Sequence, residues 1–258
     1  MTKEEFSNQF SVLYNNVTSN QAPGLSEYEK SVFLTKGQDE VLKNYFLPQS
    51  NSKQAGYDDN QKRQIDFSMI TKVYTVGSQG LNTAALYDGH SNSVNVALPT
   101  DVMMIINERV TVTRNSTTGV GLVVRALQFD DYDKLMSKPF TRPLKNQAWR
   151  IIVSETAGKA DLIVGPKDTI TSYVIRYVKR PKPIITGDLD GLTIHGYYLT
   201  GGTVPAAGTY QTTDGECELD PILHEEILQR AVELAKVAWT ATGGDNTQAV
   251  MAAGQRSE

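Results

Sequence analysis

The feature that most constrains the fold is a long stretch of β-strand pattern between two helical ends. Between residues 65 and 180, short runs rich in Val, Ile, Thr and Tyr alternate with Gly, Pro, Asn and Asp, which is typical of strands and turns. Residues 1–47 and 216–242 instead carry apolar residues at helical spacing. Neither end could bury its apolar face alone, so each is the obvious packing partner of the other. We therefore expect an α+β fold in which an N-terminal helical hairpin and a C-terminal helix form a helical core that carries a large β-rich central insertion.

Two capping boxes mark the expected hairpin. Thr2 with Glu5, and Ser26 with Glu29, have the spacing at which a hydroxyl and a carboxylate each accept from the other residue's backbone N–H. Pro48 ends the second helix. The polar residues 49–66 that follow are expected to form an exposed loop.

Seven strands are expected in the middle of the chain. They are 72–76, 94–98, 102–113, 120–129, 148–154, 160–164 and 171–178. Asn115 to Gly119 is predicted as the tip of a hairpin. Residues 130–136, whose first turn is acidic, are predicted as a short helix.

A glycine-rich stretch separates the strands from the last helix. It contains seven glycines between Gly187 and Gly215 and is predicted as a hairpin or an irregular extended arm. Asp220 suits the N-cap of the last helix, and Pro221 its first position. The predicted domains are a helical core (1–47 plus 216–242), a β-rich insertion domain (65–183), a glycine-rich extended arm (184–215) and a flexible tail (243–258).

Charge is spread unevenly along the chain, whose net charge is only −4. Residues 101–183 carry 14 basic and 8 acidic side chains, whereas residues 214–258 carry 3 basic and 9 acidic ones. Either these are ordinary solvated faces, or basic and acidic faces of neighbouring copies meet head to tail. A polycationic nucleic-acid binder is excluded. Because no apolar run approaches the roughly 20 residues of a bilayer-spanning helix and no signal-peptide pattern is present, we expect a soluble chain that is not exported.

Catalytic and metal-binding motifs are mostly absent. His224-Glu225-Glu226 begins like a zinc-protease helix, but position 228 is Leu and not the second His. Cys217 lies between Glu216 and Glu218, which disfavour a reactive thiolate. Asp188 and Asp190 suit a turn better than a calcium or acid–base site, although a hydrolase that uses them stays open as a distant alternative. We expect a structural or interaction protein with no catalytic residue, metal or cofactor.

Three stretches together resemble a known family. They are residues 15–31 (NNVTSNQAPGLSEYEKS), 176–183 (RYVKRPKP) and 217–227 (CELDPILHEEI). This combination resembles virion structural proteins of crAss-like tailed phages of gut bacteria, in particular the ring proteins of the head-to-tail connector. The regions of resemblance cover roughly half of the chain and leave out the central strands.

The resemblance implies an assembly function. It implies a ring of about twelve copies in the neck of the virion, below the portal protein, which joins the portal to the tail and extends the DNA channel. The implied partners are further copies of the chain, the portal, and neighbouring connector or tail proteins, with genomic DNA only transiently close to the lumen and no membrane. Synthesis is expected in the cytoplasm of the host bacterium. The acidic C-terminal segment is a candidate lining of the channel.

Nine residues are candidates for the contacts between subunits. Three alanines make one strip of the last helix narrow, so that another helix can approach closely. The basic residues end a strand, where solvated charge is the plain alternative, and the tyrosines lie in the arm. The candidates are Ala231, Leu234, Ala235 and Ala238 on the last helix, Tyr197 and Tyr198 in the arm, and Lys179, Arg180 and Lys182.

The alternative function is a β-rich, virion- or tail-associated module that binds a host glycan or a partner protein. In that case aromatic side chains would serve as stacking platforms. The candidates are Trp149, Tyr197, Tyr198 and Tyr210. The competing explanation is that these aromatic residues fill the core.

Overall fold

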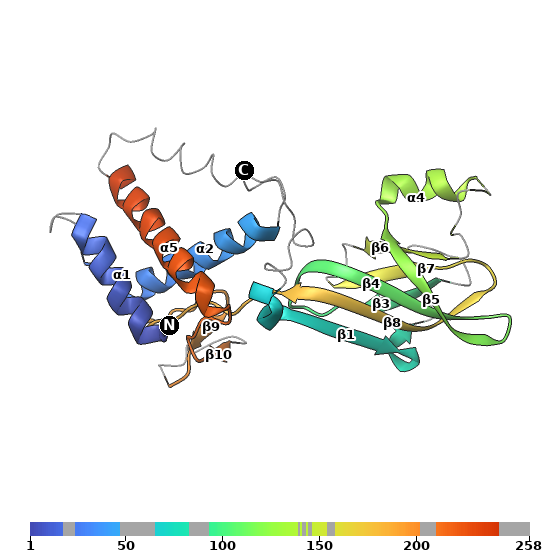
Figure 1. Ribbon diagram of the computed structural model, residues 1–258, viewed down its shortest axis with the longest axis horizontal. Helices are drawn as coiled ribbons and strands as arrows, with labels where there is room; N and C mark the ends of the chain where they lie inside the picture. Colours follow the sequence, from blue (N-terminus) through green and yellow to red (C-terminus); the bar gives the residue numbers. More distant parts are fainter. Residues whose placement is uncertain are drawn as a thin grey trace. The chain divides into compact units, whose positions relative to one another are not determined.

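The computed structural model describes residues 1–17, 24–46, 65–82, 93–138, 140, 143, 146–153, 158–201 and 210–242. The chain divides into two compact units (Figure 1). Residues 71–180 form one, which we call the β unit; residues 1–70 and 181–258 form the other, which we call the helical unit. The predicted α+β class, with helices at both ends and a β-rich middle, is confirmed. In the part of the chain that the structure describes, no helix is long and apolar enough to cross a membrane.

Among the described residues, three α-helices build the core of the helical unit. They are α1 (Lys3–Val17), α2 (Glu27–Phe46) and α5 (Pro221–Thr242). α5 packs against both α1 and α2 (Figure 1). Aromatic and aliphatic side chains from all three are buried: Phe6, Phe10, Tyr14, Leu34, Val41, Leu42, Leu223, Ile227 and Leu228. The last helix thus completes the core that the N-terminal helices begin.

Both predicted capping boxes are present. The Thr2 N–H donates to Glu5 Oε2 at 2.9 Å, and the Glu5 N–H donates to Thr2 Oγ1 at 3.3 Å. Ser26 and Glu29 make the same reciprocal pair at 2.8 and 3.3 Å. At α5, Asp220 accepts from the Ile222 N–H at 3.0 Å. These local contacts satisfy N–H groups that a helix start leaves without partners.

One eight-stranded sheet makes up most of the β unit. Its strands are β1 (Thr71–Gly77), β2 (Leu81–Asn82), β3 (Ser93–Ala97), β4 (Val102–Arg114), β5 (Thr117–Ala126), β6 (Gln147–Val153), β7 (Lys159–Ile163) and β8 (Asp168–Lys179), in the order β1-β8-β4-β5-β6-β7-β3-β2. Neighbouring strands are antiparallel except for the parallel pair β5 and β6. The seven predicted strands are all found. β2 is missed by the sequence pattern because two residues carry no periodic signal.

The sheet curls so that its two edges approach each other. β1 and β2 lie at opposite edges, yet only the short 3-10 turn Ser78–Gly80 separates them. A flat sheet of this size would hold its edge strands roughly 33 Å apart, at about 4.8 Å per strand. Such a link spans about 14 Å at most. The concave side is therefore closed around a core of side chains from nearly every strand: Val76, Val96, Val110, Val112, Leu122, Ala148, Ala160, Leu162, Ile170, Tyr173, Ile175 and Tyr177.

A buried ion pair lies on the concave side. Arg150 Nε stands 3.0 Å from Glu108 Oε1, and both side chains are more than nine-tenths buried. The Tyr173 hydroxyl donates to the same carboxylate. Burial raises the pKa of Glu108 above 4.5, although Tyr173 and Arg150 act in the opposite direction. The ion pair has poor hydrogen-bond geometry, since Arg150 Nε and Nη1 have no hydrogen-bond partner among the described atoms.

Helix α4 (Phe129–Met136) covers part of the convex side. Its Tyr132 packs on Trp149, Ile151 and Ile163 of β6 and β7. The predicted helix at 130–136 is thus present, with Asp130 and Asp131 in its first turn. The convex side of β1, β8, β4 and β5 is not part of this cluster.

Two sequence predictions need adjustment. The hairpin between β4 and β5 turns on two residues, Asn115 and Ser116, whose φ values are 47° and 67°. The turn is therefore tighter than the predicted 115–119, and β5 begins at Thr117, opposite Arg114. Most of the predicted loop at 49–66 and all of the predicted tail at 243–258 lie outside the described residues.

Candidate assembly surfaces

The glycine-rich segment is largely packed into the helical unit. Ile184, Ile185, Leu189 and Ile194 are buried. Further along, the short strands β9 (Tyr197–Leu199) and β10 (Gln211–Thr213) pair in parallel. The ends of the segment are tied together because the Ile185 N–H donates to the Gly215 carbonyl at 3.3 Å. Where it is described, the predicted arm is therefore anchored at its base and partly structured.

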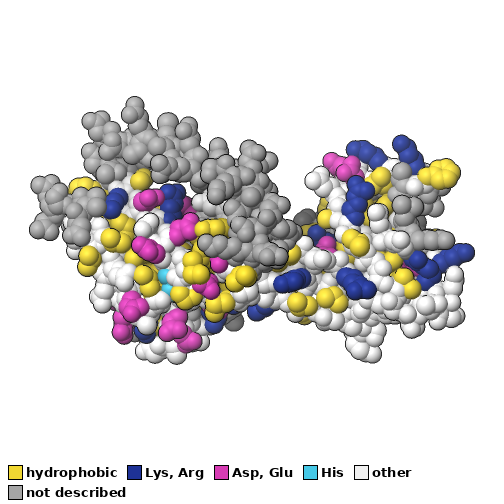
Figure 2. All heavy atoms as spheres, in the orientation of Figure 1, with side chains coloured by type: hydrophobic (Ala, Val, Ile, Leu, Met, Phe, Trp, Pro, Cys, Tyr) yellow, Lys and Arg dark blue, Asp and Glu magenta, His cyan; other side chains and the backbone are white. Residues whose placement is uncertain are grey.

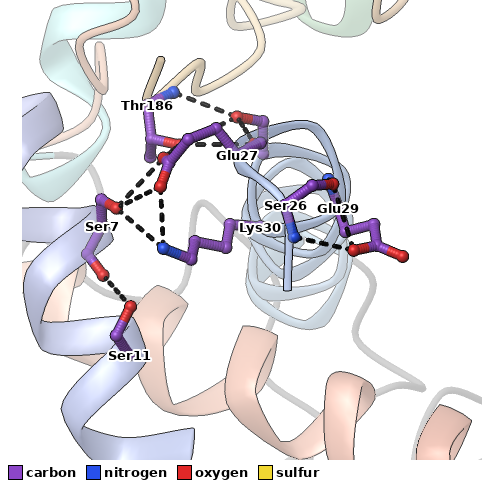
Figure 3. A network of polar contacts seen from close by, with 8 residues as sticks. Ser7, Ser11, Ser26, Glu27, Glu29, Lys30 and Thr186 are labelled. Atoms are coloured by element: carbon purple, nitrogen blue, oxygen red, sulfur yellow. Dashed lines mark hydrogen bonds and ion pairs between the residues drawn. The ribbon is translucent and has the colours of Figure 1, made fainter. Parts of the chain in front are cut away.

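A polar network fixes this segment to α1 and α2 (Figure 3). The Glu27 carboxylate accepts from Lys30 Nζ at 2.8 Å, Thr186 Oγ1 at 2.7 Å and Ser7 Oγ at 3.0 Å. The Thr186 N–H in turn donates to Ser31 Oγ at 3.0 Å. Burial pushes the pKa of Glu27 upward, but the bonds from Lys30, Thr186 and Ser7 outweigh it and hold the pKa below 4.5. A charged Glu27 therefore connects three parts of the chain that are distant in sequence.

The two candidate tyrosines have different surroundings. Tyr197 packs beside the buried cluster of Ile185, Leu189 and Ile194. Tyr198, the next residue of β9, points to the opposite face and is half-buried. Tyr197 thus contributes to the core of the helical unit, and Tyr198 is the one of the pair that does not pack on this cluster.

The alanine strip of α5 is used within the chain. Ala231 and Ala235 are buried, and Gly37 of α2 lies against Ala231. Leu234 is half-buried and Ala238 is exposed. The close helix approach that the small residues predict is therefore made by α2 of the same chain. Of the four helix candidates, Leu234 and Ala238 are the ones that keep solvent-accessible surface.

The residues of the basic cluster are divided between the two units. Lys179 ends β8, and the Arg180 N–H donates to the Asp101 carbonyl at 2.7 Å inside the β unit. Lys182 belongs to the helical unit, where its N–H donates to Glu218 Oε2 and its carbonyl accepts from Gln38 Nε2, each at 3.0 Å. Arg180 is exposed, whereas Lys179 and Lys182 are half-buried.

The proposed glycan platform is not assembled within either unit. Trp149 is buried under α4 in the β unit. Tyr197, Tyr198 and Tyr210 belong to the helical unit. Trp149 is therefore a core residue, and the binding-module alternative loses its largest aromatic surface.

The other residues that the sequence offered for catalysis or metal binding are buried or take part in structural hydrogen bonds. Burial raises the pKa of the Cys217 thiol to about 11. The Asp190 N–H donates to Asp188 Oδ1 at 3.1 Å, which is a turn contact. His224 is buried, with the Met1 amino group 2.6 Å from Nδ1 and the Leu219 carbonyl 3.0 Å from Nε2. Among the described residues, no group of His, Cys, Asp or Glu side chains could hold a metal ion.

A basic surface that was not predicted from the sequence lies on the convex side of the β unit. Arg109 of β4, Arg125 of β5 and Arg176 of β8 are exposed there, and none makes an ion pair or side-chain hydrogen bond with a described residue. Val73 of β1 and Val123 of β5 lie among them, 65% and 70% exposed. We call these five residues the arginine face. All five side chains occupy outward positions in the inward–outward alternation of their strands, a pattern that is visible in the sequence. Only the order of the strands in the sheet brings them together.

The helical unit has the opposite charge. Among its described residues, the exposed acidic ones are Glu4, Glu5, Glu29, Asp188, Asp190, Asp214, Glu216, Glu225, Glu226 and Glu233. On the side of the molecule in Figure 2, most of the visible acidic side chains lie over the helical unit and most of the basic ones over the β unit. The uneven charge of the sequence is thus an uneven charge of two folded units.

Comparison with known proteins identifies the family. The model of the phage tail ring protein 3/4 family matches residues 1–247. The chain is similar to ring protein 4/5 of Bacteroides phage crAss001, with 46% identity over 266 residues that cover all of both chains. It is also similar to ring protein 3 of the same phage, with 30% identity over 250 residues that cover 95% of this chain and 99% of the relative. The resemblance to crAss-like phage ring proteins is confirmed, and the chain belongs to the phage tail ring protein 3/4 family.

Proposed function

We propose that this chain is a structural subunit of a closed ring in the connector that joins the portal to the tail of a phage. The observation that carries the proposal is the similarity to two ring proteins of one phage over nearly the whole chain. Similarity of that extent includes both the helical unit and the β unit, so the proposal concerns the complete arrangement and not one shared motif.

The charges of the two units support a ring. Identical subunits that meet through two different surfaces close into a ring when the rotation between them closes. The helical unit offers an acidic surface and the β unit a basic one, so each copy offers both halves of such a contact. About twelve copies is the number that the family resemblance implies.

The channel of such a ring has to let DNA slide. A wall rich in arginine would hold phosphates, whereas an acidic wall would repel them. The exposed carboxylates of the glycine-rich segment and its continuation suit that wall: Asp188, Asp190, Asp214 and Glu216. In this arrangement DNA is near the protein only in transit. The role is assembly, without catalysis, cofactor or metal, in the neck of a virion built in the host cytoplasm.

The higher identity to ring protein 4/5 favours it over ring protein 3 as the counterpart. The difference is 46% against 30%, each over nearly the full length. We therefore assign the chain to the position of ring protein 4/5 in its own phage.

Electron microscopy of the purified chain over a concentration series tests the proposal, both alone and with the portal and tail proteins of the same phage. Closed rings, formed alone or on the portal, are the expected result and give the copy number directly. Monomers at every concentration, with no affinity for portal or tail proteins, would contradict the connector function.

A further inference from the structure

The arginine face has the composition of an interface and not of a solvated surface. Arg176 lies opposite Val73 on the neighbouring strand, and Arg109 lies opposite Val123. Exposed apolar side chains therefore alternate with arginines across four strands. Arginine is enriched in the contact regions of protein interfaces, where apolar groups form the centre and charges the rim.

One arginine is spread flat on this face. The Arg109 side chain extends over Gly121 of β5, where an added Cβ would collide with its guanidinium group. Glycine at this position leaves the space that the guanidinium fills. The charge of Arg109 is consequently held against the sheet, which leaves the face level enough for another surface to dock.

A surface of complementary character lies at the start of α5. Ile222 is 65% exposed. Glu225 and Glu226 follow it by three and four residues, so the three side chains lie on one side of the helix, and both glutamates are exposed. Glu225 accepts from Gln229 and Glu226 from Tyr45, so neither is paired with a cation in these contacts. We call Ile222, Glu225 and Glu226 the acidic α5 face.

We propose that the arginine face of one copy docks on the acidic α5 face of the next copy in the ring. This inference rests on the proposed function and names the surfaces that make the contact between subunits. Charge complementarity carries it: three arginines around exposed valines meet two glutamates beside an exposed isoleucine. Each copy has one surface of each kind, so the contact is heterologous and can repeat around a closed ring.

Two observations favour this occupant over DNA. Val73 and Val123 gain nothing from a phosphate backbone, whereas an apolar side chain such as Ile222 can bury exposed valine surface. The acidic α5 face also differs from a channel wall, because it includes an exposed isoleucine. An exposed apolar side chain contributes nothing to a wall along which DNA slides. The acidic residues of the glycine-rich segment remain for the channel.

Charge reversal on each surface tests the contact. One variant of the full chain carries Arg125→Glu and Arg176→Glu, and the other carries Glu225→Lys and Glu226→Lys. Their association is measured by sedimentation velocity and electron microscopy at low and at high salt. Circular dichroism and thermal melting of each variant show whether it has folded. Lys134→Glu on α4 and Glu4→Lys on α1 are the controls, each an exposed charge reversal in the same unit but outside the proposed contact.

Each variant alone is expected to associate at least roughly tenfold more weakly than the unchanged chain, because like charges then meet in the contact. An equimolar mixture of the two folded variants is expected to recover association, since the reversed surface of one matches the reversed surface of the other. Recovery should weaken as salt increases. The controls should associate like the unchanged chain.

Three outcomes would overturn the inference: unchanged association of either variant, a mixture of folded variants that does not associate, or loss of binding to a double-stranded DNA oligomer by the arginine variant while its rings form normally. If the unchanged chain forms no ring even with the portal, the connector function fails by its own test. Pairing of the two variants as a heterodimer would still support the two surfaces in that case, so the two failures are distinguishable.

Discussion

Gly37 of α2 faces Ala231 of α5 at a distance that leaves no room for a side chain. A Cβ on Gly37 would lie 3.0 Å from the Ala231 nitrogen and 2.9 Å from the Ile227 carbonyl oxygen. Both neighbours are backbone atoms, which cannot turn away as the end of a long side chain can. The contact between the N-terminal hairpin and the last helix therefore depends on a glycine in the middle of a helix, where glycine is otherwise unfavourable.

Gly37→Ala should destabilise the protein although alanine is the better helix former. Alanine gains about 1 kcal/mol of helix propensity, but forcing the helices apart costs about 1–3 kcal/mol. Gly37→Leu should cost more than Gly37→Ala. Chemical denaturation measures both, with Lys36→Ala, a substitution at the exposed neighbouring position, as the matched control. Equal or greater stability of Gly37→Ala would contradict the close approach.

The ion pair on the concave side of the sheet should be costly to break and cheap to replace. Glu108→Leu leaves Arg150 buried without its carboxylate, which should cost about 3–5 kcal/mol. Replacing both residues, with Glu108→Leu and Arg150→Met, should restore most of that loss because no buried charge remains. Equilibrium unfolding of the two single variants and the double variant gives the coupling energy. A double variant no more stable than Glu108→Leu would show that the pair does more than compensate for its own burial.

The sequence predicts what is local and misses what depends on strand order. Thr2 with Glu5 and Ser26 with Glu29 fix helix starts within four residues, so their spacing alone is sufficient. The parallel pairing of β5 with β6 and the pairing of β1 with β8 arise from contacts between distant residues, which carry no short-range pattern. The arginine face was missed for the same reason: Arg109, Arg125 and Arg176 become neighbours only through the order of β8, β4 and β5.

The small residues in the sequence predict only part of the helix packing. The alanines of α5 indicated a close helix approach, and such an approach exists, but the sequence does not say whether the other helix belongs to the same chain. Gly37 within a helical pattern was the missing clue, since an isolated glycine there often marks a packing contact. Because the small residues Gly37 and Ala231 face each other, the helix that approaches α5 closely is α2.

Glu27 should make the stability of the helical unit depend on acid pH. Its pKa lies below 4.5 in the folded protein, so its contribution is fully present above 4.5 and is lost as the pH falls through the folded pKa. Glu27→Gln should lower the melting temperature at neutral pH and reduce this acid-dependent loss. Glu29→Gln, which affects only the exposed capping box, is the matched control. An unchanged pH profile for Glu27→Gln would show that the network in Figure 3 does not need the charge.

His224 should add a second pH dependence at higher pH. Burial, the largest cause, lowers its pKa below 6.5, and the nearby amino group of Met1 acts in the same direction. A neutral ring fits both contacts, since Nε2–H can donate to the Leu219 carbonyl while Nδ1 accepts from the Met1 ammonium. Because the unfolded chain takes up a proton near pH 6.5 and the folded chain resists it, stability should fall as the pH drops below 6.5 and should level off below the folded pKa.

Melting temperatures between about pH 5 and pH 7.5 measure this window. His224→Gln should flatten the profile there even though it lowers stability overall. A profile for His224→Gln as steep as that of the unchanged chain would assign the pH dependence to another group.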